Sequence, residues 1–143
     1  MYYSALNVAE YIIQRCNNQG RLISNLKLQK ILYFVQAEFL VATGDVCFKD
    51  EIVAWDFGPV VPCVYHRYKV YGSASIPCLY DYDQYRISYA DLQIMNGIID
   101  ECAKLSASQL VDITHSQTPW QDAYRSFNKI ITPESIRRYF TEE

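Results

Sequence analysis

Apolar residues recur with a helical period at the start of the chain. The spacing predicts one helix over residues 4–16 and a second over residues 24–43. Ser4 and Ser24 are suitable N-caps for these segments, and Gly44 supplies the left-handed residue that commonly follows a helix. The N-terminal part is therefore expected to form two helices joined by a short polar connection.

The second predicted helix is so rich in apolar residues that we expect it to be central and buried on most sides. Its apolar stripe consists of Leu28, Ile31, Leu32, Val35 and Phe39, extended by Phe34 and Leu40. Gln29 and Lys30 interrupt this stripe, and we do not expect both to lie in the core. Lys30 would either extend its ammonium group to water or pair with a carboxylate such as that of Asp56.

The period changes in the middle of the chain. Residues 50–56 are rich in β-branched and aromatic side chains and predict a short strand or extended arm that ends at Gly58 and Pro59. Because proline is well tolerated in the first turn of a helix, a helix is predicted over residues 60–71. Residues 73–87 lack helical spacing, which indicates a surface loop.

Helical spacing returns in the C-terminal half. It predicts helices over residues 88–104 and 107–114, a short helical turn from Pro119, and a last helix from Thr132 that an extended segment precedes. The predicted fold class is therefore mainly α. We expect a single compact helical domain over residues 1–143 with a minor β element, an α+β arrangement.

The composition is typical of a folded globular domain. Of the 143 residues, 50% are apolar and 20% are charged, which provides enough apolar surface for one core and differs from the composition of disordered chains. The formal net charge is -3, and the Lys and Arg residues are scattered. Since a chain without a basic cluster is a poor ligand for phosphate backbones, we do not expect nucleic acid to be a partner.

The cysteines and the N-terminus bear on compartment and chemistry. The 5 cysteines are widely spaced and never form a C-x-x-C pair, which argues against a disulfide framework and a thiolate zinc site. No secretory signal pattern is present, and no segment has the ~20 apolar residues of a membrane helix. We therefore expect a cytoplasmic protein without metal or cofactor. Since the sequence contains neither a nucleophile elbow nor a phosphate loop, we expect no enzyme activity.

Four local motifs follow one another along most of the chain. They are LKLQKILYF at residues 26–34, AWDFGPVVP at residues 54–62 with Tyr65, the pair Tyr71-Gly72, and LVDITH at residues 110–115 followed by Pro119-Trp120. In this order they resemble the motifs of the SocA-like antitoxins, also called Panacea domains. That family is frequent in prophages and other mobile elements.

The resemblance implies a function that composition and spacing do not show. It implies a non-catalytic binding module that neutralises a protein toxin encoded nearby by binding it directly. The alternative is a prophage-associated DNA-binding regulator or an adaptor without its own catalysis, and the acidic charge balance counts against DNA binding. The sequence does not indicate an oligomeric state.

The candidate partner-binding residues are mainly aromatic. Tyrosine and tryptophan provide a large contact area at little entropic cost, and the chain has 13 tyrosines, several of them between residues 65 and 89, where an exposed patch is predicted. The candidates are Trp55, Tyr65, Tyr68, Tyr82, His115 and Trp120. Each also has a structural interpretation that the sequence leaves open: the rings can cover the edge of the core, and the histidine can serve as a hydrogen-bonded helix terminator.

Overall fold

A computed structural model describes residues 2–78 and 86–142 of the chain. Within them lie seven α-helices, one 3-10 helix and a small three-stranded sheet, so the predicted mainly α fold with a minor β element is confirmed. The elements are α1 (Ala5–Asn18), α2 (Asn25–Thr43), β1 (Ile52–Trp55), β2 (Gly58–Val60), α3 (Pro62–Tyr68), η1 (Lys69–Tyr71), α4 (Tyr89–Ala103), α5 (Ala107–His115), α6 (Thr118–Arg125), β3 (Ile130–Ile131) and α7 (Pro133–Thr141).

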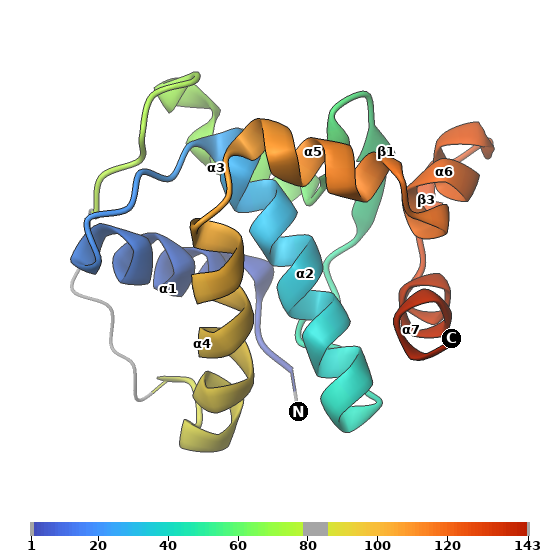
Figure 1. The fold of residues 1–143 in the computed structure, drawn as a ribbon, viewed down its shortest axis with the longest axis horizontal. Coiled ribbons are helices and arrows are strands. Elements are labelled where there is room, and N and C mark those ends of the chain that lie inside the picture. The colour runs from blue at the N-terminus through green and yellow to red at the C-terminus, as the bar shows by residue number, and fades with distance from the viewer. Residues whose placement is uncertain (1, 79–85, 143) are drawn as a thin grey trace.

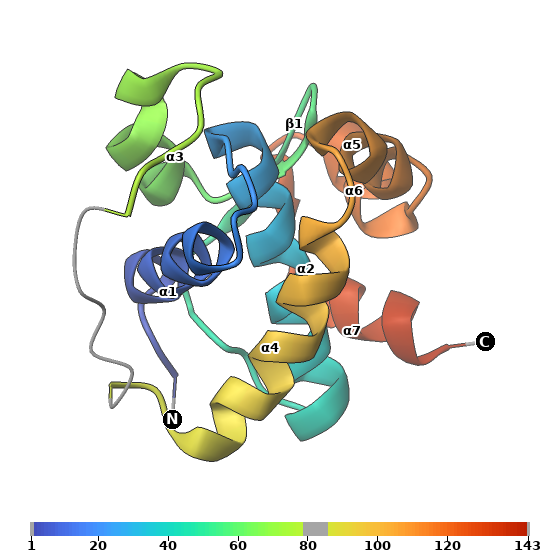
Figure 2. The same cartoon turned by 60° about the vertical axis from the view of Figure 1, so that its left-hand side comes forward.

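Helix α2 runs through the middle of the molecule, with α1 and α4 on one side, α6 and α7 on the other, and α5 across its upper end in Figure 1 (Figures 1 and 2). Its predicted caps are present: the Ser24 side chain accepts from the Lys27 amide, and Gly44 is left-handed with φ 78°. The apolar stripe is buried as expected, with Leu28, Ile31 and Leu32 fully inaccessible to solvent. The central helix is thus the core of the domain.

Gln29 and Lys30 both lie in that core, contrary to the expectation that only one of them could. Gln29 is 1% exposed and Lys30 is 0% exposed. Each is accommodated by backbone groups of the β2 region: the Gln29 amide oxygen accepts from the Val61 N–H at 2.9 Å, and the Lys30 ammonium donates to the Pro59 carbonyl at 3.0 Å. Lys30 therefore neither reaches water nor pairs with a carboxylate, because a main-chain carbonyl takes the place expected for Asp56.

The sheet differs from the prediction at residues 58–60. Strand β1 pairs antiparallel with both β2 and β3 in the order β2-β1-β3, so the segment expected to begin a helix is instead an edge strand. An edge position suits Pro59, which lacks an N–H to donate to a ladder. The helix begins later, at Pro62, and ends at Tyr68, where η1 continues to the end of the predicted range.

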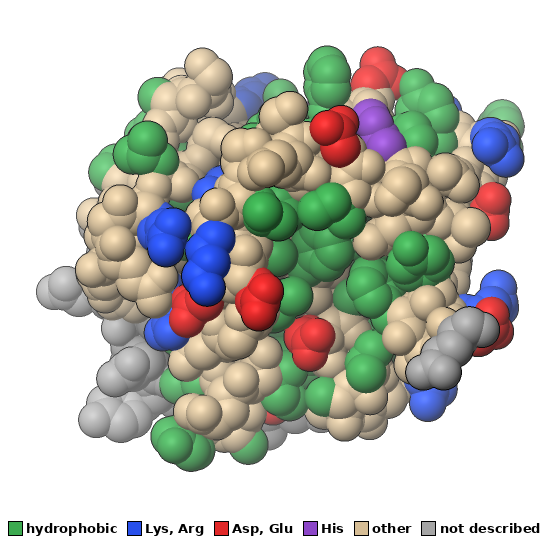
Figure 3. Space-filling model, in the orientation of Figure 1, with side chains coloured by type: hydrophobic (Ala, Val, Ile, Leu, Met, Phe, Trp, Pro, Cys, Tyr) green, Lys and Arg blue, Asp and Glu red, His purple; other side chains and the backbone are tan. Residues whose placement is uncertain are grey.

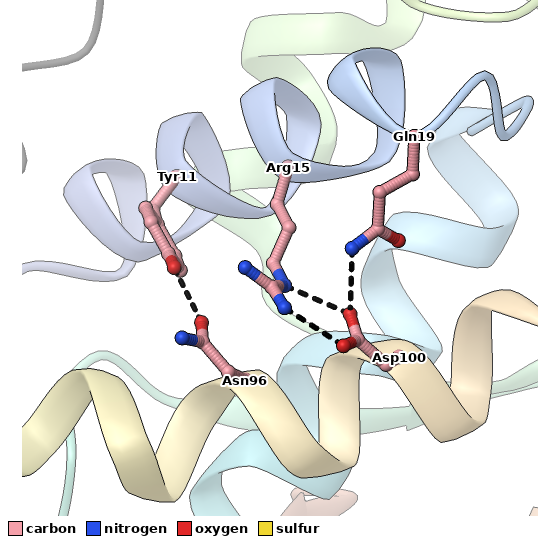
Figure 4. A network of polar contacts seen from close by, with 5 residues as sticks. All are labelled: Tyr11, Arg15, Gln19, Asn96 and Asp100. Carbon is pink, nitrogen blue, oxygen red and sulfur yellow. Dashed lines mark hydrogen bonds and ion pairs between the residues drawn. The ribbon is translucent and has the colours of Figure 1, made fainter.

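A polar cluster joins α1 and α4 on the left side of Figure 1 and is enlarged in Figure 4. The Arg15 guanidinium of α1 donates to both carboxylate oxygens of Asp100 in α4, at 2.8 and 2.7 Å, and Gln19 adds a third hydrogen bond at 3.2 Å. Tyr11 donates to the side-chain oxygen of Asn96 one turn away. The Arg15 hydrogen bond holds the pKa of Asp100 below its usual range. This cluster fixes the crossing of α1 and α4.

The outer surface carries no continuous basic region on the face shown in Figure 3. There the Lys and Arg side chains lie in small separate groups, while apolar side chains gather over the middle of the face. No helix among the described residues is long and apolar enough to span a membrane.

Candidate functional site

An open groove lies beside the β1–β2 hairpin, between the start of α2, α3, η1 and the end of α6. Its volume is about 630 Å³. We call it the aromatic groove because its apolar walls are formed mainly by Leu26, Trp55, Phe57, Val60, Tyr65 and Tyr124. The groove is therefore a hollow with aromatic walls on the surface of the domain, next to the turn between β1 and β2.

Two of the sequence-predicted residues form one wall of the aromatic groove. The rings of Trp55 and Tyr65 meet edge to face, with ring centroids 4.9 Å apart. Both side chains are partly exposed, and Phe57 at the hairpin turn is 66% exposed. The hairpin thus presents one large apolar side chain to solvent and a second beside it in the groove.

Two more of the sequence-predicted residues, His115 and Trp120, belong to a stack behind the hairpin. The ring of His115 lies 4.1 Å from that of Trp120, and Trp120 stacks on Tyr124 at 4.7 Å. The Lys129 ammonium covers the Tyr124 ring at 4.2 Å, a cation–π contact. We call these four residues the aromatic column.

The aromatic column is hydrogen-bonded to the hairpin. The Trp120 indole N–H donates to the Trp55 carbonyl at 2.9 Å, and Nε2 of His115 lies 2.9 Å from the Asp56 carbonyl oxygen. Because a carbonyl oxygen only accepts, this nitrogen carries the hydrogen. The Tyr124 hydroxyl donates to the Asp56 carboxylate, which raises the pKa of Tyr124. The column therefore fixes the backbone of the turn that carries Phe57.

Residues that are far apart in the sequence are thus brought together: Trp55, Tyr65, His115 and Trp120 lie around one hairpin. Tyr68 is not part of this surface, since it is 2% exposed and belongs to the core. It was expected to be exposed, but Val64 and Tyr68 form the inner face of the short helix α3, so the neighbouring Tyr65 faces outward. Tyr82 lies outside the described residues.

Sequence reasoning did not select two important residues of the site. Phe57 lies within the AWDFGPVVP motif, but nothing in the local pattern distinguishes an exposed hairpin tip from a strand end. Tyr124 follows Trp120 by four residues, the spacing that places two side chains on one helix face, and this spacing was the available signal.

The charges around the aromatic groove are few. Lys69 and Lys129 line it, and the one carboxylate in the lining, that of Asp56, already accepts the Tyr124 hydroxyl. The groove is thus apolar with a small positive excess, in a chain whose net charge is -3.

The described residues contain no group of three His, Cys, Asp or Glu side chains placed to hold a metal ion. The exposed thiol of Cys63, in the first turn of α3, donates to the Asp50 carboxylate at 3.4 Å. Partial burial, together with this hydrogen bond, raises the pKa of Cys63 to about 11. The thiol is therefore protonated at neutral pH, and the protonated form is a poor nucleophile.

Comparison with known proteins agrees with the motifs. A family profile described as "Antitoxin SocA-like, Panacea domain" matches residues 28–121. Antitoxin SocA of Caulobacter vibrioides (strain NA1000 / CB15N) is 37% identical over 124 residues, which cover 79% of this chain and 66% of that protein. The match thus spans slightly less than two thirds of the length of this relative, and no solved structure matches significantly. With its motifs in the expected order and the profile matching well over half of its residues, the chain belongs to the SocA-like antitoxin family of Panacea domains.

Proposed function

We propose that this protein is an antitoxin that neutralises a protein toxin by direct binding, with the aromatic groove as the contact surface for the toxin. The single observation that carries the proposal is the convergence of family motif residues on an open apolar groove. Trp55 and Tyr65 line it, and His115 and Trp120 fix the hairpin beside it. Family membership supports the antitoxin role, and the groove supplies a surface for it.

The groove has the physical properties of an interface hot spot. Partly exposed aromatic side chains around a hollow can enclose an apolar side chain of a partner and exclude water from it. Trp55, Phe57 and Tyr65 are large enough to contribute most of the binding free energy. An apolar segment of the toxin is the expected occupant.

The aromatic column has a separate role. Its hydrogen bonds to Trp55 and Asp56 hold the hairpin turn before any partner arrives. A surface that is already ordered loses less conformational entropy on association, which improves affinity without adding contacts. His115 and Trp120 are therefore positioning residues, whereas the residues of the groove touch the toxin. Tyr124 belongs to both groups, because it is hydrogen-bonded to Asp56 and also lines the groove.

Neutralisation in this proposal requires occupation of the toxin surface and no chemical turnover. The exposed thiol of Cys63 is protonated at neutral pH, and it donates to the carboxylate of Asp50 rather than to a histidine. Antitoxin and toxin would therefore act in stoichiometric amounts, with inhibition reached by binding alone.

Co-expression with the protein encoded by the neighbouring reading frame tests the proposal. We expect the double variant Phe57→Ala, Tyr65→Ala to lose rescue of growth and to bind that protein more than about tenfold more weakly, since hot-spot residues often contribute more than ~1 kcal/mol each. The matched control is Phe127→Ala, Tyr89→Ala, which removes the same side chains from positions that are 105% and 79% exposed and lie outside the groove. Equal rescue by both folded variants would contradict the assignment of the groove. Absence of any complex with the wild-type chain would contradict direct binding itself.

A further inference from the structure

A second groove lies at the other end of β1. It is formed by the end of α2, the segment 44–51, β3 and the start of α7, and its volume is about 630 Å³. Ile52 lines this groove, whereas Ala54 and Trp55 line the aromatic groove. Its apolar floor consists of Leu40, Val46, Phe48, Ile52, Ile131 and Ile136.

Carboxylates predominate around this floor, so we call it the acidic groove. The lining contains Asp45, Asp50, Glu51 and Glu134 but only Lys49 and Arg137 as basic residues. The Lys49 ammonium lies 4.5 Å from the centre of the Tyr2 ring, a cation–π contact, whereas the Arg137 guanidinium lies near Gly44. The charge balance is the opposite of that in the aromatic groove, where two lysines face one engaged carboxylate.

Two of these four carboxylates accept hydrogen bonds from backbone amides. Asp50 accepts from the Ala5 amide at 2.9 Å, and Asp45 accepts from the Val46 amide at 2.8 Å. Glu51 and Glu134, in contrast, are exposed. Neither forms an ion pair within residues 2–78 and 86–142.

Glu51 and Glu134 lie at the same end of the sheet. Ile52 is paired with Ile131 across β1 and β3, so Glu51 directly precedes this pair in the chain, and Glu134 follows it by three residues in the first turn of α7. Two exposed carboxylates that are not in an ion pair among the described residues therefore flank one end of the apolar floor.

From this arrangement we propose that the acidic groove binds a segment of a protein partner that alternates apolar and basic residues. An aliphatic side chain of the segment would lie on the floor beside Ile52 and Ile131. Its neighbouring Lys or Arg side chains would pair with Glu51 and Glu134. The net charge of -3 attracts such a segment over a longer range and so favours encounter. This inference does not depend on the toxin contact at the aromatic groove, because the two surfaces differ in position and in charge.

The test uses a short synthetic peptide in which leucine and arginine alternate. Titrated into the isotope-labelled protein at low salt, it should shift the amide resonances of Glu51, Ile52, Ile131 and Arg137. Peptides with glutamate in place of arginine, or serine in place of leucine, should cause no comparable shifts. Shifts centred on Trp55 and Tyr65, shifts spread evenly over the surface, or no binding would each overturn the proposal. So would the same shifts on simply raising the protein concentration, which would indicate a second copy of this chain in the groove.

Charge-neutralised variants provide the second arm of the experiment. Glu51→Gln, Glu134→Gln should weaken peptide binding by roughly 2-fold to 20-fold, the range expected for two partly exposed ion pairs. The control variant Glu101→Gln, Asp112→Asn changes the net charge equally at two exposed positions outside the groove. Specific binding requires that the control keep the wild-type affinity. Equal weakening in both variants would show a general charge effect and overturn the assignment of the site.

Discussion

Beneath the hairpin, the aliphatic part of Lys30 fills the space that a side chain at position 58 would need. A Cβ atom on Gly58 would lie 2.7 Å from Cε of Lys30 and 2.9 Å from Oγ1 of Thr114. Gly58 also has φ 102°, a conformation that residues with a side chain rarely adopt. The glycine of the family motif is therefore required twice, by backbone conformation and by packing.

The first prediction separates these two requirements. Gly58→Ala should lower the free energy of unfolding by roughly 2–5 kcal/mol, because backbone strain and overpacking add. Gly20→Ala is the matched control, since Gly20 has φ 68° but no heavy atom within 4 Å of the added carbon. The control should lose only about 1 kcal/mol, the cost of the backbone conformation alone. Denaturant midpoints measure both, and equal losses would show that Lys30 and Thr114 move aside without cost.

Lys30 itself makes stability depend on pH. Burial lowers its pKa from 10.5 to about 7, so the folded protein releases a proton at a pH where the unfolded chain still holds it. Between these two values the unfolded state binds more protons, and stability therefore rises with pH. Below about pH 7 Lys30 is protonated in both states, so it no longer makes the free energy of unfolding depend on pH.

The second prediction tests this rise of stability with pH. Lys30→Met removes the titrating group while keeping a long side chain beneath Gly58. The free energy of unfolding of the wild type should rise by roughly 1 kcal/mol relative to the variant between pH 7 and pH 8. Buried thiols such as Cys47, whose pKa values are raised, act in the opposite direction at higher pH but are present in both proteins and cancel in the difference. Parallel pH profiles would mean that Lys30 stays charged in the folded state.

At the scale of elements, α2 organises its neighbours through polar side chains as well as through its apolar stripe. Gln36 accepts from the amides of Cys47 and Phe48 and donates to the Phe48 carbonyl. The Lys27 ammonium donates at 2.8 Å to the carbonyl of Ala103, the last residue of α4. Each buried polar group of this kind satisfies main-chain groups that would otherwise lack partners.

The third prediction tests this role at Gln36. Gln36→Leu keeps a similar volume but leaves three buried backbone groups unsatisfied, so the free energy of unfolding should fall by roughly 2–4 kcal/mol. Amide hydrogen exchange should increase first at Cys47 and Phe48, whose N–H groups lose their acceptor. Gln93→Leu, on the exposed face of α4, is the control and should change stability by less than about 0.5 kcal/mol. If both variants are equally stable, a water replaces the amide.

The secondary structure could be predicted where it depends on local sequence, and it was missed where it depends on distant partners. Helix periods and the caps Ser4 and Ser24 are local properties, and the structure confirms them. The edge strand at Pro59 was predicted as the start of a helix because its pairing with Ala54 and its contact with Lys30 come from outside the segment. The burial of Gln29 and Lys30 was missed for the same reason, since their partners are backbone groups about thirty residues away.

At the scale of the whole molecule, the candidate site could be predicted only in part. The motifs identified Trp55 and Trp120, but the hydrogen bond between them spans 65 positions and depends on how α6 packs against β1. The aromatic composition of the region around Tyr65 predicted a partner surface there. It did not show which rings face outward, because α3 is too short for its period to define a face.

The last prediction concerns whether these parts unfold as one unit. Each of the seven α-helices in the described part of the chain contributes buried residues to one apolar cluster, which favours a single cooperative transition. The chain offers two independent probes of it. Both tryptophans lie at the hairpin, so fluorescence reports on that end of the molecule, whereas far-ultraviolet circular dichroism reports on all helices. Denaturant curves from the two probes should coincide in midpoint and slope. If the fluorescence transition instead precedes the loss of helix, the hairpin and the aromatic column form a separate, less stable unit, and the contact surface would not be fixed before a partner binds.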